Sequence, residues 1–412
     1  MTSIQKALIA AFLILGLGIR FYIAVSDRTL PEKDAAEYDR LAMNLVEGRG
    51  YRDAVGDLTA YRPPLYPMFL AGVYFVAGHN FQAARIAQAL LSILTVFFIA
   101  LWAATLFGGA AACFATAFAA VYPPFYAFYF SSSALITETL YTFLLTLAFA
   151  GLYGFLTSLK AWTAFVSGLA WGLSILTRPI SLPLLGALPV ILWISGYPLR
   201  QIVRYHLWAW VMAAAVLAPW ILRNYRVFHT FLATSTHGGT SFYASNHPGS
   251  DGMGTHFYGN VVMVEWEKLR EKGMPEPERS SYFFKKGLDF LRTHPREGLR
   301  LFVRKAFFYL EPFHTIEENG RSRRTVNWGY VLAVLASGIG FVRGLKNPEF
   351  RKPLVSLSLV FLYFIVFHAF FHAAYRYRLP TEPILILMAS FAVMSFIKRQ
   401  PALAELARDN AP

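Results

Sequence analysis

The stretch ARIAQALLSILTVFFIALWAATL, residues 84–106, decides the class of this chain. After Arg85 it contains no charged residue, and most of its side chains are aliphatic or aromatic. A helix rises about 1.5 Å per residue, so about 20 apolar residues cross the roughly 30 Å hydrocarbon layer of a bilayer. The stretch therefore predicts a transmembrane helix.

The composition of the whole chain agrees with this interpretation. Of its 412 residues 56% are hydrophobic and only 15% are charged, whereas soluble domains carry about 25% charged residues. Nine further apolar segments have a similar character. We therefore expect an all-α polytopic membrane protein with about ten transmembrane helices. The predicted spans are 7–25, 84–106, 109–130, 138–157, 161–177, 181–197, 206–222, 326–343, 353–372 and 379–397.

Two apolar runs, 65–78 and 299–312, are too short or too interrupted by proline and charge to cross a membrane. We interpret them as interfacial helices. No large soluble C-terminal domain is expected, and the outer loop region is small. The expected divisions are a transmembrane core over 1–222 that includes the first outer loop 26–83, an outer region over 223–325, C-terminal spans over 326–397, and a cytoplasmic tail over 398–412.

Basic residues in short loops predict the orientation. Lys160, Arg200 and Lys346 lie in short loops that the positive-inside rule places in the cytoplasm, which puts the loops 26–83 and 223–325 outside. The net charge of +14 favours anionic head groups or phosphorylated substrates over nucleic acid, because no basic element suited to a nucleic-acid groove is visible. With Cys113 as the single cysteine, no intrachain disulfide can form.

The first outer loop begins with an acidic helix. Asp34 lies on the same helical face as Tyr38 and Leu45, a face that is otherwise apolar. A partly desolvated carboxylate has a raised pKa and becomes a better base unless a cation compensates for its charge. The alternative is that Asp34 only caps the helix and pairs with Lys33 or Arg20.

Four arginines precede prolines at predicted outer turns. Arg62 stands before two prolines in AYRPPLYP, Arg178 lies in LTRP, and Arg376 and Arg378 lie in YRYRLP. Proline fixes the backbone, so each guanidinium is presented from a stiff turn. A guanidinium binds phosphate in a bidentate manner and stays charged. The alternative is that these arginines reach from the membrane edge to water.

A second acid, Glu138, begins a later predicted span on the same side of the membrane. Thr137 or Ser133 could cap this helix, with Glu138 favoured by its dipole. Two acids on one face also suggest a shared site. The chain has no phosphate-binding P-loop, nucleophile elbow or dinucleotide fingerprint, so nucleotide binding is not expected.

Taken in order, these motifs resemble the C-type glycosyltransferase superfamily, specifically the dolichyl-phosphate-mannose protein mannosyltransferase and lipid A aminoarabinose transferase group. The resemblance extends over most of the chain, and it depends on the order of the motifs and their shared outer location. The motifs are the acid-x-x-x-Tyr of Asp34 to Tyr38, the basic-Pro-Pro turn at Arg62, the acid Glu138, the TRP turn at Arg178, PW-x-x-RN from Pro219 to Asn224, YASN ending at Asn246, and the run from Arg376 to Pro380.

The resemblance implies an inverting glycosyltransferase at the outer face of a bacterial inner membrane. Its donor would be a sugar linked to polyprenyl phosphate, and its acceptor a hydroxyl of an envelope lipid, a polysaccharide or a protein. By resemblance, Asp34 is the catalytic base. The implied phosphate-binding residues are Arg62, Arg178, Arg376 and Arg378, and the implied substrate-lining residues are Tyr38, Tyr61 and Asn246.

Metal binding stays open in this resemblance. The first loop has Asp-Ala where many relatives have Asp-Glu, and the second acid is Glu138 where they have aspartate. No cofactor is required; a divalent cation such as Mg, Mn or Zn would use Asp34 and Glu138. Two other classes of function are a lipid or glycan transporter, which predicts inverted repeats and charges at the membrane midplane, and a scaffold subunit, which predicts no dependence on Asp34.

Overall fold

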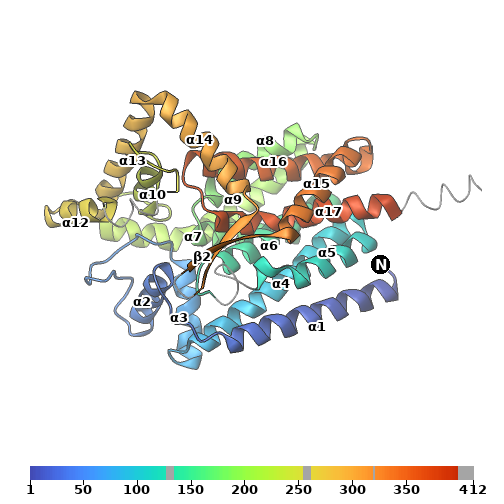
Figure 1. Ribbon diagram of the computed structural model, residues 1–412, viewed down its shortest axis with the longest axis horizontal. Coiled ribbons are helices and arrows are strands. Elements are labelled where there is room, and N and C mark those ends of the chain that lie inside the picture. Colours follow the sequence, from blue (N-terminus) through green and yellow to red (C-terminus); the bar gives the residue numbers. More distant parts are fainter. Residues whose placement is uncertain (127–133, 254–260, 319–320, 398–412) are drawn as a thin grey trace, which may run out of the picture.

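The computed structural model describes residues 1–126, 134–253, 261–318 and 321–397, and long helices dominate it (Figure 1). The elements are α1 (Ser3–Ser26), α2 (Asp34–Val46), α3 (Leu65–Ala77), α4 (Phe81–Phe107), α5 (Gly109–Val121), η1 (Pro123–Phe125), α6 (Glu138–Ser158), α7 (Ala161–Thr177), α8 (Ser181–Ile194), α9 (Leu199–Phe228), α10 (His237–Ser245), α12 (Met263–Glu271), α13 (Glu276–Thr293), α14 (Pro295–Leu310), β1 (Phe313–Glu318), β2 (Arg321–Val326), α15 (Trp328–Leu345), α16 (Pro348–Phe370), η3 (Tyr375–Thr381) and α17 (Glu382–Ile397).

The helical membrane fold expected from the sequence is present. In the part of the chain that the structure describes, seven helical segments are long and apolar enough to cross a membrane. Three other predicted spans are the shorter helices α5, α7 and α8, so the total of ten crossings stays a prediction. The seven segments are α1, α4, α6, α9, α15, α16 and the continuous segment Tyr375–Ile397.

The predicted span 109–130 is α-helical only as far as Val121, where α5 ends, and the short 3-10 helix η1 follows. Pro123 and Pro124 follow, and proline ends a helix because it has no N–H and restricts the residue before it. The carbonyls of Ala119 and Ala120 at this end accept hydrogen bonds from the Arg20 guanidinium of α1, at 3.1 and 2.8 Å. Residues 127–130 of the predicted span lie outside the described residues.

Close contacts between small residues hold the centre of the bundle together. A Cβ atom at Gly168 of α7 would lie 3.0 Å from the Cα of Ala209 on α9, and one at Gly172 would lie 3.1 Å from the Cα of Ala213. Two glycines one turn apart thus let the backbones of α7 and α9 approach, as in many membrane helix pairs. Trp171, between them, is fully buried.

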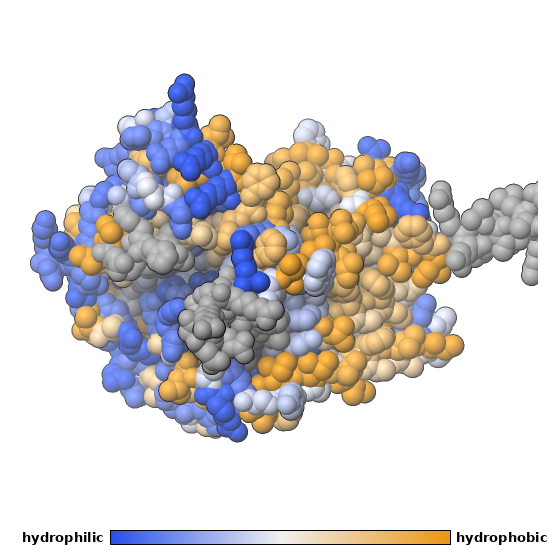
Figure 2. Space-filling model, in the orientation of Figure 1, coloured by the Kyte–Doolittle hydropathy of each residue, from blue (hydrophilic) through white to orange (hydrophobic). Residues whose placement is uncertain are grey.

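Polar side chains gather at one end of the molecule, whereas the rest of the visible surface is largely apolar (Figure 2). This polar end carries α2, α10, α12 and α13, while the N-terminus lies at the opposite end (Figure 1). The acidic helix expected from Pro31 begins at Asp34. The two short apolar runs predicted as interfacial form α3 and most of α14.

The all-α membrane fold expected from the sequence holds, and within the described residues one short hairpin accompanies the helices. β1 and β2 pair antiparallel, with Phe313 opposite Val326 and Glu318 opposite Arg321. A two-stranded hairpin of six residues per strand buries little surface of its own, so it leaves only a weak alternating pattern in the sequence. The hairpin lies directly before α15.

Candidate active site

Asp34, the first residue of α2, lies between two arginines from distant parts of the chain. Nη2 of Arg62, in the stiff turn before α3, donates to its Oδ1 at 2.8 Å. Nη2 of Arg376, in η3, donates to its Oδ2 at 2.8 Å. The Asp34 side chain keeps 29% of its surface exposed, so it is accessible from the polar end. Both carboxylate oxygens are thus occupied by guanidinium groups while the site stays open.

The ion pairs continue on both sides of Asp34 as an alternating row of acids and arginines. Arg376 Nε lies 3.5 Å from Oε1 of Glu138, the first residue of α6. The same oxygen accepts a 2.5 Å hydrogen bond from Nη2 of Arg178, in the turn between α7 and α8. At the other end, Arg62 donates to Oε2 of Glu37 from Nε and Nη2, at 2.8 and 2.6 Å. We call this row the charge row: Glu37, Arg62, Asp34, Arg376, Glu138 and Arg178.

The partners of Asp34 decide between the interpretations that the sequence left open. Among the described residues its ion pairs are to Arg62 and Arg376, not to Lys33 or Arg20 as in the alternative interpretation. Its pKa is not raised, because cations compensate for its charge. Burial does act to raise the pKa of Asp34, but the charges of Arg62 and Arg376 outweigh it and hold the pKa well below its usual range. The sequence left open whether a cation compensates for the charge of Asp34. In the structure two arginines do so, and they decide the direction in which its pKa moves.

Glu37 is the residue of the charge row that sequence reasoning missed. It lies three residues after Asp34, so the two carboxylates are neighbours on the surface of α2. The sequence shows Glu37 as a second acid near Asp34, but Glu37 lies off the apolar helical face that pointed to Asp34. The acid that seemed to be missing directly after Asp34 is thus supplied almost one turn later, and Arg62 is held by both carboxylates.

Aromatic side chains surround the Arg62 guanidinium. Its Cζ lies 5.3 Å from the ring centre of Tyr38 and 5.6 Å from that of Tyr61. His237, at the start of α10, lies edge to face with Tyr61 and 3.4 Å from Arg62 Nη1. Burial and the neighbouring Arg62 charge lower the pKa of His237 well below its usual value. His237 is a neutral neighbour that the sequence did not single out.

Two other predicted site residues have different partners. Arg378 donates to Oε1 of Glu382 at 2.8 Å and to the carbonyl of Glu311, and only 4% of its surface is exposed. Asn246 lies at the C-terminal end of α10, where its amide donates to the carbonyls of Phe370 and Phe371. Arg378 and Asn246 therefore connect elements around the site, and these contacts are not to the charge row.

Neither residue proposed as a cap of α6 is seen to cap the helix with its side chain. Thr137 is the N-cap residue but makes no side-chain cap to the helix backbone. Its hydroxyl instead donates to Oε2 of Glu138 at 3.2 Å and accepts from Nε of Arg178 at 3.1 Å. Thr137 thus orients the Glu138–Arg178 pair. Ser133, the other proposed cap, lies outside the described residues.

The carboxylates do not fit a divalent cation in this arrangement. Mg²⁺, Mn²⁺ and Zn²⁺ need accessible oxygen or nitrogen ligands. Each oxygen of Asp34 accepts from an arginine, and Oε1 of Glu138 faces Arg178 and Arg376. A cation would have to displace these guanidinium groups. Within the described ranges, no group of three His, Cys, Asp or Glu residues is placed to hold a metal.

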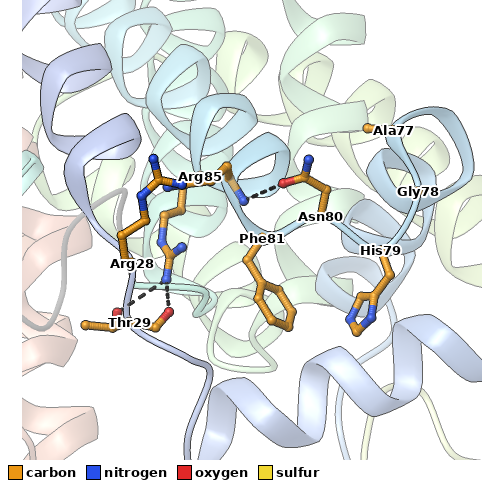
Figure 3. Close-up of a pocket in the computed structure, with 9 residues that line it drawn as sticks. Arg28, Thr29, Ala77, Gly78, His79, Asn80, Phe81 and Arg85 are labelled. Carbon is orange, nitrogen blue, oxygen red and sulfur yellow. Dashed lines mark hydrogen bonds between the residues drawn. The ribbon is translucent and has the colours of Figure 1, made fainter.

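A surface cleft of about 500 Å³ lies where the segment after α1 meets the turn between α3 and α4 (Figure 3). Arg85 of α4 reaches across it and donates to the carbonyl of Thr29 and, at 3.3 Å, to its hydroxyl. Asn80 caps α4 at the same place. None of the residues that line this cleft is one of the predicted site residues.

The sequence of the chain matches a known family over part of its length. Residues 61–222 match the family described as dolichyl-phosphate-mannose-protein mannosyltransferase. This range holds three residues of the charge row, Arg62, Glu138 and Arg178. None of the curated proteins compared with the chain is significantly similar in sequence.

Two solved structures share its fold. ArnT from Cupriavidus metallidurans bound to undecaprenyl phosphate is 15% identical, with a TM-score of 0.58 over 98% of this chain and 63% of ArnT. The oligosaccharyltransferase AglB from Archaeoglobus fulgidus, with an inhibitory peptide and a dolichol-phosphate, is 12% identical, with a TM-score of 0.60 over 100% of this chain and 52% of AglB.

AglB has also been solved in complex with Zn and sulfate, and that structure is 14% identical to the chain. The chain thus spans less than two thirds of the length of these proteins. The resemblance predicted from the sequence is confirmed: the chain has the fold of ArnT and AglB, and its residues 61–222 match the dolichyl-phosphate-mannose-protein mannosyltransferase family.

Proposed function

We propose that the chain is a membrane glycosyltransferase. It moves a sugar from a polyprenyl-phosphate donor to a hydroxyl of an envelope lipid, a polysaccharide or a protein, at the outer face of a bacterial inner membrane and with inversion. The observation that carries this proposal is Asp34, partly exposed between Arg62 and Arg376. The lipid phosphates bound to ArnT and AglB support the choice of donor.

In this proposal Asp34 takes the proton of the acceptor hydroxyl. The acceptor oxygen attacks the anomeric carbon from the face opposite the phosphate, and the bond between that carbon and the phosphate oxygen breaks. The leaving polyprenyl phosphate takes the bonding electrons and gains a negative charge. Arg62 and Arg376 stabilise this charge, and Arg178 orients Glu138 beside them. Such charge stabilisation is often the largest single catalytic effect.

The arginines also explain how a carboxylate with a low pKa can act as a base. Without donor, Arg62 and Arg376 hold Asp34 in its charged and weakly basic form. The donor phosphate attracts the same guanidinium groups, and the attraction grows as the second negative charge develops. Each arginine that turns from Asp34 toward phosphate lets the pKa of Asp34 rise. Donor binding and activation of the base are therefore coupled.

Replacing Asp34 by asparagine tests the proposal. Asp34→Asn should reduce transfer by about 10²–10⁴-fold, the usual contribution of a general base, while the protein level stays unchanged. Transfer is measured by mass spectrometry of envelope lipids and glycans, after a deletion strain has identified the missing product. Undecaprenyl phosphate should bind the variant at least as well as the wild type, because two arginines lose a competing anion. Retained transfer would end the assignment of the base.

A further inference from the structure

Glu276 is a buried acid, and along the sequence it lies far from every predicted site residue. It is the first residue of α13, and 7% of its surface is exposed. Its Oε1 accepts from the backbone N–H of Ala60 at 2.9 Å and from the hydroxyl of Thr236 at 2.7 Å. Its Oε2 accepts from the hydroxyl of Thr59 at 2.7 Å. One side chain thus joins three separate segments.

A carboxylate is costly to bury, so the contacts must compensate for the loss of water. The three donors are neutral, and burial raises the pKa of Glu276 despite them. Two features oppose that cost. Glu276 lies in the first turn of α13, where the helix dipole favours an anion, and Arg279 on the next turn contributes a positive charge.

The segments that Glu276 joins lead directly to the Arg62 environment. Ala60 lies two residues before Arg62, and Thr236 directly precedes His237. The N–H of Thr236 donates to the carbonyl of Ala60 at 3.0 Å, which closes a ring of hydrogen bonds around the carboxylate. From that ring, Arg62 and His237 project to within 3.4 Å of each other.

We propose that Glu276 is a positioning residue for Arg62. It fixes the outer helix α13 to the backbone on which Arg62 is presented, so that the guanidinium reaches Asp34 and the donor phosphate. The proposal rests on the proposed function, because it gives Arg62 the donor phosphate as its ligand. It adds a role for the outer region over 223–325, from which His237 reaches Arg62 of the charge row.

Three variants test the proposal. Glu276→Ala removes all three acceptor contacts and should weaken binding of undecaprenyl phosphate by about tenfold or more. Glu276→Gln keeps a carbonyl oxygen for the Ala60 N–H and should stay within about threefold of the wild type. Glu278→Ala is the matched control, since Glu278 is an exposed acid in the same helical turn. Equal binding by wild type and Glu276→Ala would overturn the proposal.

A double-mutant cycle separates positioning from a general loss of stability. If Glu276 acts through Arg62, Glu276→Ala should weaken binding much less in an Arg62→Ala background than in the wild type. Equal effects in both backgrounds would contradict the proposal. In transfer assays the Michaelis constant for the donor should rise more than that for the acceptor.

Hydrogen exchange gives a readout that does not depend on glycosyl transfer. In Glu276→Ala, peptides that contain residues 57–64 and 234–240 should exchange faster, whereas α4 should be unchanged. Unchanged exchange in both peptides would overturn the positioning role. A wild type that binds no undecaprenyl phosphate would instead overturn the proposed function, and the exchange result would still decide whether Glu276 holds the backbone before Arg62.

Discussion

Arg20 and Arg376 both satisfy their guanidinium groups inside the protein, but with different kinds of partner. Arg20 is fully buried and donates to the Ser92 hydroxyl and to backbone carbonyls, among them that of Gly16 at 3.0 Å. Arg376 is 26% exposed and lies between the carboxylates of Asp34 and Glu138. One arginine is held by fixed helix backbone, the other by side chains that can move.

Under the proposed function, this difference separates a cation that can bind the donor phosphate from one that holds helices together. A carbonyl in a helix cannot move away, so the contacts of Arg20 hold α1, α4 and α5 in place. A carboxylate can be replaced by another anion with the same geometry, and phosphate is such an anion. The charge row is therefore suited to exchange one of its acids for a ligand, whereas the surroundings of Arg20 are suited to stability.

Of the changes that test the comparison between Arg20 and Arg376, the removal of Arg376 should have the largest effect. Arg376→Ala should lower kcat/KM for transfer by about 10²–10³-fold, because one donor to the developing phosphate charge is lost. It should also raise the pKa of Asp34 by removing one of its two cations. Arg351→Ala, at an exposed arginine of α16, is the control. If Arg376→Ala and the control transferred sugar at comparable rates, Arg376 would have no role in the reaction and would not differ from Arg20 in this respect.

Arg20→Met should have the opposite effects: it should lower the stability of the protein and leave the rate of transfer unchanged. Its loss leaves the carbonyls of Ala119 and Ala120 without this donor at the end of α5. Removing such a charged hydrogen-bond group should cost about 3 kcal/mol of unfolding free energy. Thermal unfolding in detergent measures the loss, and kcat at a temperature where the variant stays folded should equal that of the wild type. A large fall in kcat with unchanged stability would show that Arg20 belongs to the reaction.

How far the sequence could predict this site is clear from Asp34. The apolar runs predicted the helical membrane fold. The order of the motifs singled out five residues that the structure brings together: Asp34, Arg62, Glu138, Arg178 and Arg376. The alternative that paired Asp34 with Lys33 or Arg20 was wrong, because Arg376 is 342 residues away and no local pattern reports so distant a contact. For the same reason the sequence left open whether a cation lowers the pKa of Asp34.

The remaining misses have separate physical causes. Glu37 lies off the apolar face of α2, so the helical pattern that singled out Asp34 did not include it. Glu276 carries no motif, because its role depends on neutral donors from two other segments. Arg378 shares its local pattern with Arg376, yet its position two residues later in η3 directs it to Glu382. Sequence reasoning could not choose between the two arginines.

The smallest expected effect concerns Lys305 of α14. Like Arg20 it is a buried cation with neutral partners, but unlike an arginine it can lose its charge. It is 1% exposed and donates to Oδ1 of Asn246 and to the carbonyls of Phe370 and Phe371. Burial lowers the pKa of Lys305 to about 7, from an ordinary value of about 10.4 in unfolded chains. Below both values the lysine is charged in the folded and unfolded states, so the cost of burying its charge is fully present.

As the pH rises above 7, the folded protein releases this proton before the unfolded chain does, so the lysine makes folding less costly. The unfolding temperature of the wild type, measured relative to Lys305→Met, should therefore rise by about 2–4 °C between about pH 6.5 and about pH 8.5. Lys285→Met, at an exposed lysine of α13, should show no such dependence. An arginine at this position would stay charged, so Lys305→Arg should also remove the dependence. A constant difference between wild type and Lys305→Met would mean that Lys305 keeps its proton throughout and that its neutral partners hold it as firmly as those of Arg20.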